Sequence, residues 1–336
     1  MEFREGMEKR YSQILSNYLT ERDEQALYQG QKFSRKAIEQ VIPPEEIVNL
    51  HRKTLKKLIP DLPQEVVLSL DFLLEVMMGY GLAYQEHQSL RFQQEELKTE
   101  IEVAAGVQQT LLETTIPSIS SLDVGAISIP SKQMNGDYIN FVSDDQATLS
   151  VAIADVIGKG IPAALCMSMI KYAMDSLPNM RLTPSEVLKN LNRVVEQNFD
   201  MGMFITMLYG IYHTDSHMFT YSSAGHEPGF IYRKSDDTFS TMETKGLVLG
   251  VDKSTEYKQY QISLNEGDMI ILLSDGVTEG RICGEFIERE QITNYIRQYI
   301  HLPAQEIVEN VYKELLKLQD FELKDDFTFI LLKRCV

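Results

Sequence analysis

Four short acidic clusters lie directly beside apolar runs that have the composition of buried strands. Asp155 and Asp275 follow such runs, whereas Asp137 and the pair Asp325-Asp326 precede them. If these runs are antiparallel strands, the four clusters can meet at one edge of the sheets. Carboxylates brought together repel each other and lose hydration, unless cations occupy the space between them. The clusters therefore predict a cation site.

The ligand types narrow the choice of cation. Carboxylate oxygens with few histidines or cysteines nearby favour Mg²⁺ or Mn²⁺ over Zn²⁺. Each cluster alone is a weak signal, because Asp275-Gly276 is also ordinary turn chemistry and the pair at 325–326 could simply cap a strand. Gly158-Lys159-Gly160 suggests a phosphate loop, but the spacing G-x-x-x-x-G-K-[ST] is absent. Only the four clusters together indicate chemistry.

The elements that would position these carboxylates begin after Pro117. Strands are predicted at 122–129, 138–142, 148–154, 204–212, 218–222, 269–273 and 327–332. Helices are predicted at 163–176, 184–198, 291–299 and 304–318. Because many strands follow one another through short turns, antiparallel sheets flanked by helices are favoured over a doubly wound parallel sheet.

The first part of the chain is expected to be almost entirely helical. Helices are predicted at about 1–20 and 22–41, and a third runs from Pro43-Pro44 to Leu58 with acidic residues in its first turn. A fourth begins near Pro63 and shows helical apolar spacing. Four helices joined by short loops predict a small bundle.

The fourth helix is expected to continue beyond the bundle, because no proline follows before Pro117. A heptad of apolar residues marks this stretch: Leu90, Leu97, Ala104 and Leu111. Gln94 and Gln108 occupy other positions of the same seam. This pattern predicts a short, polar coiled coil that could cross a second copy or act as a switchable linker. The alternative is a solvated single helix.

Composition excludes several classes of protein. The chain has 336 residues, enough for about two domains, and a net charge of −17. Such a charge repels nucleic acid and anionic lipid, so neither is an expected partner. Three widely spaced cysteines fit a reducing cytoplasm and no disulfide framework. No signal peptide and no run of about 18 apolar residues is evident, so we expect a cytoplasmic protein without a membrane helix.

The spacing of these motifs resembles a known family. The motifs are Gly136-Asp137-Tyr138, Ala154-Asp155-Val156-Ile157-Gly158-Lys159-Gly160, Ser223-Ala224-Gly225-His226-Glu227-Pro228, Ser274-Asp275-Gly276-Val277-Thr278-Glu279 and Asp325-Asp326-Phe327-Thr328. In this order they resemble the PPM family of metal-dependent serine/threonine phosphatases, in its bacterial SpoIIE-like branch. With the helical bundle in front, the chain is similar to environmental-stress phosphatases of the Bacillus sigma-B pathway. The expected domains are a bundle at 1–84, a linker at 85–114 and a phosphatase domain at 115–336.

The resemblance implies an α-β-β-α sandwich of two antiparallel sheets with two Mn²⁺ or Mg²⁺ ions at one end. The ligands it implies are Asp137, Asp155, the Val156 carbonyl, Asp275 and Asp325, with Asp326 and Gly136 in secondary roles. Asp155 and Asp275 would act in catalysis through a metal-bound water that attacks phosphorus. His226 is interpreted as a structural residue. The alternatives are an inactive module that keeps the fold and a two-metal phosphodiesterase.

The position of one segment suggests a means of regulation, and the resemblance implies the partners. The apolar, methionine-rich segment 161–170 begins a helix after Asp155, and it is either an ordinary core helix or a switch against which the linker docks. The regulatory candidates are Gln108, Gln109, Ile161, Met167 and Ile170. The implied partners are a second copy bound through the bundle and linker, an RsbT-like activator and a phosphorylated RsbV-like anti-anti-sigma factor as substrate.

Overall fold

The computed structural model describes residues 2–22, 24–144, 147–158, 160–176, 182–198, 203–282, 285–319 and 321–335. Lys159 of the Gly-Lys-Gly segment lies outside them. The chain divides into two compact units, Met1–Lys98 and Thr99–Val336. The last turns of the long fourth helix therefore belong with the second unit, and the predicted linker 85–114 is split between the two.

The first unit is helical, as the sequence predicted. Its helices are α1 (Glu2–Glu21), α2 (Glu24–Glu39), α3 (Pro44–Leu58) and the first part of α4 (Gln64–Leu112). Proline opens α3, and Glu45 and Glu46 occupy its first turn, where carboxylates suit the helix dipole. A small core forms where Ile14, Phe33 and Leu50 meet. So small a core leaves most of the unit's apolar surface uncovered.

Helix α4 carries much of this uncovered surface. Its most apolar 18-residue window has a mean hydropathy of 1.7 and is 6% buried. By length and composition alone, such a helix could cross a membrane. The sequence analysis had predicted that no helix of this kind is present. Asp71 lies on this helix and forms an ion pair with Arg52 of α3.

The second unit contains two five-stranded sheets. One has the order β1-β12-β9-β6-β7, and the other has the order β2-β3-β4-β5-β8. The first sheet consists of β1 (Leu122–Ile129), β6 (Phe230–Arg233), β7 (Thr238–Thr241), β9 (Met269–Leu273) and β12 (Phe327–Arg334). The second consists of β2 (Asp137–Asp144), β3 (Thr148–Val156), β4 (Ile205–His213), β5 (Met218–Ala224) and β8 (Gln259–Ser263). Each strand pair in these sheets is antiparallel, as predicted.

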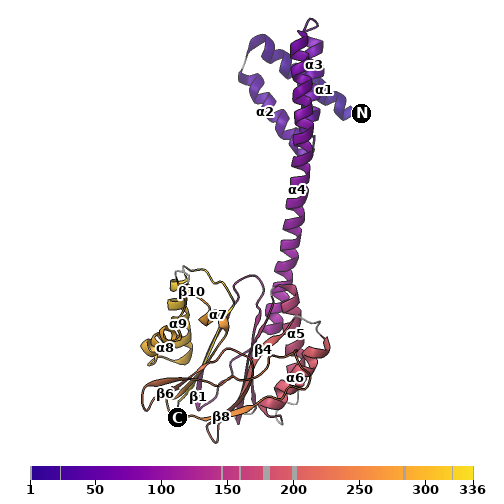
Figure 1. Cartoon of the computed structure of the whole chain (residues 1–336). Helices are drawn as coiled ribbons and strands as arrows, with labels where there is room; N and C mark the ends of the chain where they lie inside the picture. The colour runs from indigo at the N-terminus through magenta and orange to yellow at the C-terminus, as the bar shows by residue number, and fades with distance from the viewer. Residues whose placement is uncertain are drawn as a thin grey trace. The chain divides into compact units, whose positions relative to one another are not determined.

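Helices cover the outer face of each sheet (Figure 1). α5 (Ile161–Ser176) and α6 (Pro184–Asn198) share a core with β3 and β4, whereas α8 (Arg289–Tyr299) and α9 (Ala304–Leu318) share one with β9 and β12. A third core lies between the sheets and includes Val151, Leu208, Ile270 and Ile330. Successive side chains along a strand point to opposite faces of the sheet. Each sheet therefore contributes side chains both to the core between the sheets and to the core under its own helices. The predicted sandwich is confirmed.

The sequence analysis did not predict several short elements. They are β6, β7, β8, the single-turn helix α7 (Asp275–Thr278) and the two-residue strands β10 (Arg281–Ile282) and β11 (Glu285–Phe286). β7 and β8 form sheet edges with mostly exposed side chains, so they lack the apolar signal of a buried strand.

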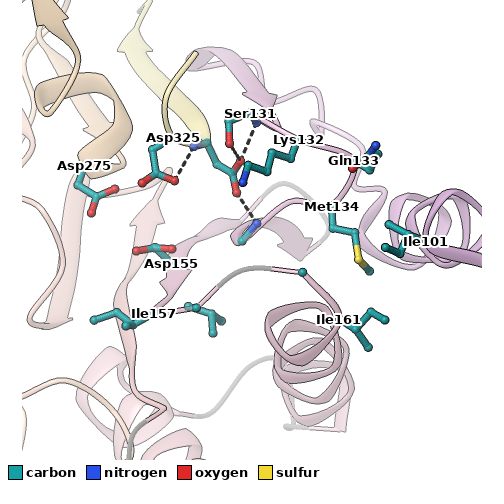
Figure 2. A pocket seen from close by; sticks show the side chains of 15 residues that line it. Ile101, Ser131, Lys132, Gln133, Met134, Asp155, Ile157, Ile161, Asp275 and Asp325 are labelled. Carbon is teal, nitrogen blue, oxygen red and sulfur yellow. Dashed lines mark hydrogen bonds between the residues drawn. The ribbon is translucent and has the colours of Figure 1, made fainter. Parts of the chain in front are cut away.

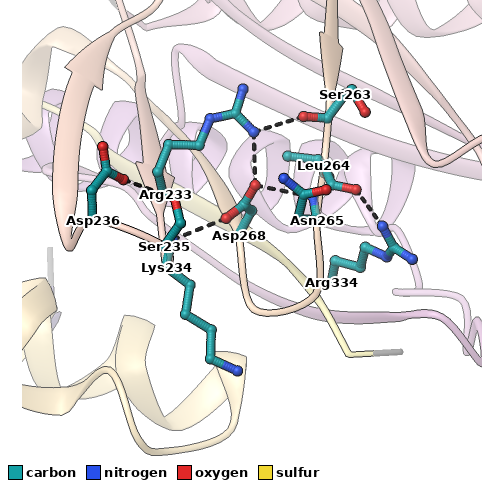
Figure 3. Close-up of polar contacts among 9 residues, drawn as sticks. All are labelled: Arg233, Lys234, Ser235, Asp236, Ser263, Leu264, Asn265, Asp268 and Arg334. Atoms are coloured by element: carbon teal, nitrogen blue, oxygen red, sulfur yellow. Dashed lines mark hydrogen bonds and ion pairs between the residues drawn. The ribbon is translucent and has the colours of Figure 1, made fainter.

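A buried carboxylate fastens the turn between β8 and β9 (Figure 3). Asp268 is 2% exposed and accepts hydrogen bonds from Arg233 Nη1 at 2.7 Å, Lys234 N at 2.9 Å and Asn265 N at 3.0 Å. Burial alone would raise the pKa of Asp268, but these donors outweigh burial and hold that pKa below its usual range. The network joins β6 to the β8–β9 turn.

Candidate active site

Carboxylates from three separate segments face one cavity of 330 Å³. Asp155, Asp275 and Asp325 all direct their side chains into this space (Figure 2). The other lining residues include Ser131, Lys132, Gly136, Val156, Ile161 and Asp326. The structure thus brings together most of the residues that the sequence analysis singled out.

Strand register explains why these carboxylates meet. Asp155 lies in β3 directly opposite Asp137 of β2 on one side and opposite Thr206 of β4 on the other. In the other sheet, β9 ends at Leu273 beside Phe329 of β12, so the segment after β9 lies beside the segment before β12. Those segments carry Asp275 and Asp325. The two sheets therefore contribute acidic groups at the same end of the sandwich.

The two members of the acidic pair have different roles in the structure. Asp326 accepts hydrogen bonds from Ser131 N at 2.7 Å, from Ser131 Oγ at 2.9 Å and from Gly136 N (Figure 2). A Cβ at Gly136 would stand 3.1 Å from Asp326 Oδ2, so glycine permits this close approach. Asp325 accepts a hydrogen bond from Asp326 N at 3.1 Å, and it lines the cavity. Asp326 thus joins the β1–β2 loop to the segment before β12, while Asp325 faces the site.

Electrostatics make this arrangement unfavourable without a cation. Asp137 lies opposite Asp155 but lines a neighbouring cavity; it is 2% exposed, and its Oδ2 has no hydrogen-bond partner in the described part of the chain. Burial, followed by the charge of Asp155, raises the pKa of Asp137 well above its usual value. Burial, followed by the charge of Asp325, raises the pKa of Asp275 to about 6. A divalent cation would stabilise these carboxylates in their charged form.

The donor set fits a hard divalent cation. The candidate ligand atoms are carboxylate oxygens and a backbone carbonyl, and one of them, Asp137 Oδ2, is buried without a partner among the described residues. Within the part of the chain that the structure describes, no three His, Cys, Asp or Glu side chains are yet close enough to enclose one ion. The ligand types are therefore suitable, and the carboxylates must approach one another when an ion binds.

Lys132 is a residue that the sequence analysis missed. It lines the acidic cavity and supplies the one basic side chain among the described lining residues (Figure 2). A lysine there can neutralise the oxygens of a bound phosphoryl group. Its position four residues before Gly136 could have drawn attention, but a single exposed lysine has no distinctive sequence signal.

The end of α4 contacts the segment that precedes Asp137. Gln108 is buried, donates from Nε2 to Asn135 O at 2.7 Å and accepts from Asn135 N at 3.0 Å. Leu112 packs against the core that contains Met167 and Ile170 of α5. The helix end therefore touches both a site loop and the helix that follows Asp155.

The other regulatory candidates lie in contrasting environments. Met167 and Ile170 are fully buried, which places them in an ordinary helix core. Ile161 is 48% exposed and lines the 330 Å³ cavity that Asp155 and Asp275 face, which we call the catalytic cavity. Gln109 is exposed and lines a separate cavity of 700 Å³ between the end of α4 and the first strands.

His226 is buried. Its Nδ1 pairs with the hydroxyl of Thr206 at 2.9 Å, and its backbone N donates to Ser223 Oγ at 3.2 Å. Burial lowers the pKa of His226 to about 4, so the ring is neutral near pH 7. It does not line the catalytic cavity.

Two family models and a curated relative match this chain. Residues 145–335 match the family described as Stage II sporulation protein E, and residues 9–83 match the N-terminal domain of phosphoserine phosphatase RsbU. The chain is 61% identical to "Phosphoserine phosphatase RsbU" of Bacillus subtilis, over the full length of both proteins.

Solved structures share the fold of the second unit. The PP2C domain of SiaA from Pseudomonas aeruginosa has a TM-score of 0.62 at 16% identity, over 72% of this chain and 98% of that one. The catalytic domain of the serine/threonine phosphatase PstP, solved with two manganese ions, has a TM-score of 0.50 at 14% identity, over 64% and 99%. These similarities identify the architecture as that of PP2C phosphatases.

Proposed function

This chain belongs to the SpoIIE family of PP2C-type phosphatases, and from that membership we propose how its site works and what controls it. It is a serine phosphatase of the sigma-B stress pathway. The observation that carries the site proposal is the convergence of Asp155, Asp275 and Asp325 on one cavity beside Lys132. That cavity combines cation ligands with a group suited to phosphate.

The cation ligands are Asp137, Asp155, the Val156 carbonyl, Asp275 and Asp325, which would hold two Mn²⁺ or Mg²⁺ ions. When bound, such ions supply a nucleophilic water near neutral pH and neutralise charge on the phosphoryl group.

The protein's own groups orient the substrate. Lys132 binds a phosphoryl oxygen, and Asp326 fixes the β1–β2 loop, which contains Ser131 and Gly136 and forms one wall of the cavity. Asp137 is buried and lies directly opposite Asp155 in the pairing of β2 with β3. It therefore helps to fix the position of the Asp155 carboxylate. The substrate is a phosphoserine protein, an RsbV-like anti-anti-sigma factor.

Control acts through the end of α4. Gln108 forms hydrogen bonds with the backbone of Asn135, and Leu112 packs against the α5 core. A shift of this helix would therefore move the segment that leads to Asp137. We place an RsbT-like activator and a second copy of the chain on the helical unit and linker, and the whole assembly in the cytoplasm. Gln109, Ile161, Met167 and Ile170 are part of this regulatory proposal.

Hydrolysis of p-nitrophenyl phosphate with and without Mn²⁺ tests the site. Asp155→Asn should lower Mn²⁺-dependent turnover by at least about 100-fold, because it removes a charged ligand at the centre of the site. Asp236→Asn, in the exposed β6–β7 turn, is the matched control and should retain wild-type turnover. Equal hydrolysis by wild type and Asp155→Asn, or hydrolysis independent of added cation, would refute the mechanism.

A further inference from the structure

A second cavity shares a wall with the catalytic pocket. It measures 290 Å³ and is lined by Gly276, Glu279, Gly280, Phe286, Gln319, Lys324 and Asp325, and we name it the Gln319 pocket. Asp325 lines both cavities, and Gly276 directly follows Asp275 of the catalytic pocket. A ligand that fills the catalytic pocket and extends beyond it can therefore reach the Gln319 pocket.

Gln319 is a buried donor without a partner among the residues that the structure describes. It is the C-cap of helix α9 and is 6% exposed, and it is its Nε2 that lacks this partner. A Cβ at Gly280 would stand 2.7 Å from this nitrogen, so the amide lies closely against the Gly280 backbone. A buried, unsatisfied N–H is costly, and such groups usually have a partner that completes them. A ligand with a hydrogen-bond acceptor could complete this donor.

The charges around the pocket indicate which acceptor fits. Glu279 and Asp325 carry carboxylates, whereas Lys324 alone among the described lining residues carries a cation. Two negative charges against one positive charge disfavour an anionic ligand and favour a neutral acceptor. Phe286 adds an aromatic side chain that is 55% exposed. A neutral carbonyl next to an apolar group is the chemistry of a polypeptide chain.

Chain geometry connects this ligand to the reaction. An extended peptide advances about 3.3–3.6 Å per residue. With a phosphoserine in the catalytic pocket, a residue one or two positions away would reach a cavity that shares Asp325 with it. We propose that the Gln319 pocket binds a backbone carbonyl beside the phosphoserine of the substrate protein, with Gln319 Nε2 as donor. This inference rests on the proposed phosphatase function.

The specificity ratio between a peptide and a small substrate tests this role. Gln319→Met removes the donor while keeping the side chain's length. We expect kcat/KM for a ten-residue phosphoserine peptide, divided by kcat/KM for p-nitrophenyl phosphate, to fall about tenfold, mainly through the peptide's KM. Gln298→Met makes the same change at an exposed position of α8 and should leave this ratio at the wild-type value.

The outcomes separate this role from a structural one. A parallel loss on both substrates would mean that Gln319 only supports Asp325, and an unchanged ratio would mean that the pocket is not used; either result overturns the proposal. If wild type hydrolyses neither substrate with Mn²⁺, the phosphatase function itself fails.

A second measurement needs no variant of the protein. In phosphopeptides that carry one backbone ester at a time, the ester weakens one carbonyl acceptor and also removes the N–H of the same peptide bond. One position within two residues of the phosphoserine should raise KM for wild type about fivefold. If no position raises KM, the proposal is wrong, even where Gln319→Met does not fold.

Discussion

Individual side chains at this site differ in what their neighbours allow them to do. Asp325 and Asp326 are adjacent in sequence, yet Asp326 receives three hydrogen bonds from the loop between β1 and β2 while Asp325 faces the cavity. The sequence could indicate that an acidic pair lies here, because the pair precedes an apolar strand. Which of the two residues faces the cavity depends on the hydrogen bonds from Ser131 and Gly136 to Asp326. These two donors are nearly 200 residues away along the chain.

Lys132 gives the residue-scale prediction. Lys132→Met removes the one cation among the described residues that line the acidic cavity. We expect kcat/KM to fall by about 10- to 100-fold for p-nitrophenyl phosphate and for a phosphoserine peptide alike, because both present the same phosphoryl oxygens.

The matched control for this prediction is Lys234→Met, an exposed lysine in the β6–β7 turn. Lys132→Arg should recover part of the loss because it restores the charge. If Lys132→Met affects only the peptide, Lys132 contacts the polypeptide and not the phosphate.

At the scale of elements, periodicity predicted the long strands and helices well, because their buried faces alternate or repeat regularly. β9, α6 and α9 begin and end where the sequence placed them. Gln108 shows the limit of this reasoning. Heptad spacing placed it on a coiled-coil seam, but both its amide atoms bind the Asn135 backbone. Such a contact depends on how two elements pack, which spacing along one helix does not encode.

The Asp268 network gives a prediction for the sheet that contains β6 and β9. Asp268→Asn should lower the free energy of unfolding at pH 7 by about 2–3 kcal/mol, because it weakens the charge-assisted bond from Arg233 in a buried setting. The folded-state pKa of Asp268 is lowered, so its carboxylate stabilises the fold above the unfolded pKa of about 3.9.

This contribution is lost as the pH falls through the folded-state pKa. Urea unfolding of wild type and Asp268→Asn should therefore differ most near pH 7 and converge below about pH 4. Asp236→Asn lies in the neighbouring exposed turn and should match wild type at every pH. A difference that grows on acidification would contradict the assigned direction of the pKa.

The Met1–Lys98 unit exposes an apolar surface along α4 that a partner could cover in the whole molecule. Leu68, Phe72 and Val76 recur every four residues along α4 and are 59%, 73% and 50% exposed. A stripe of this kind on a soluble monomer would be costly to leave in water. The net charge of −17 opposes binding to an anionic membrane, so a second copy of the chain is the occupant that we expect.

Phe72→Glu tests that occupant. A carboxylate in an apolar helix–helix contact loses its hydration without a partner, so the variant should sediment as a monomer where wild type sediments as a dimer. Gln88→Glu adds the same charge at an exposed polar position of α4 and should leave the mass unchanged. Circular dichroism should show equal helix content in all three proteins, because Phe72 is 73% exposed within the chain itself. A monomeric wild type that instead binds neutral lipid vesicles through this face would identify a membrane as the occupant, and a dimeric Phe72→Glu variant would place the contact elsewhere.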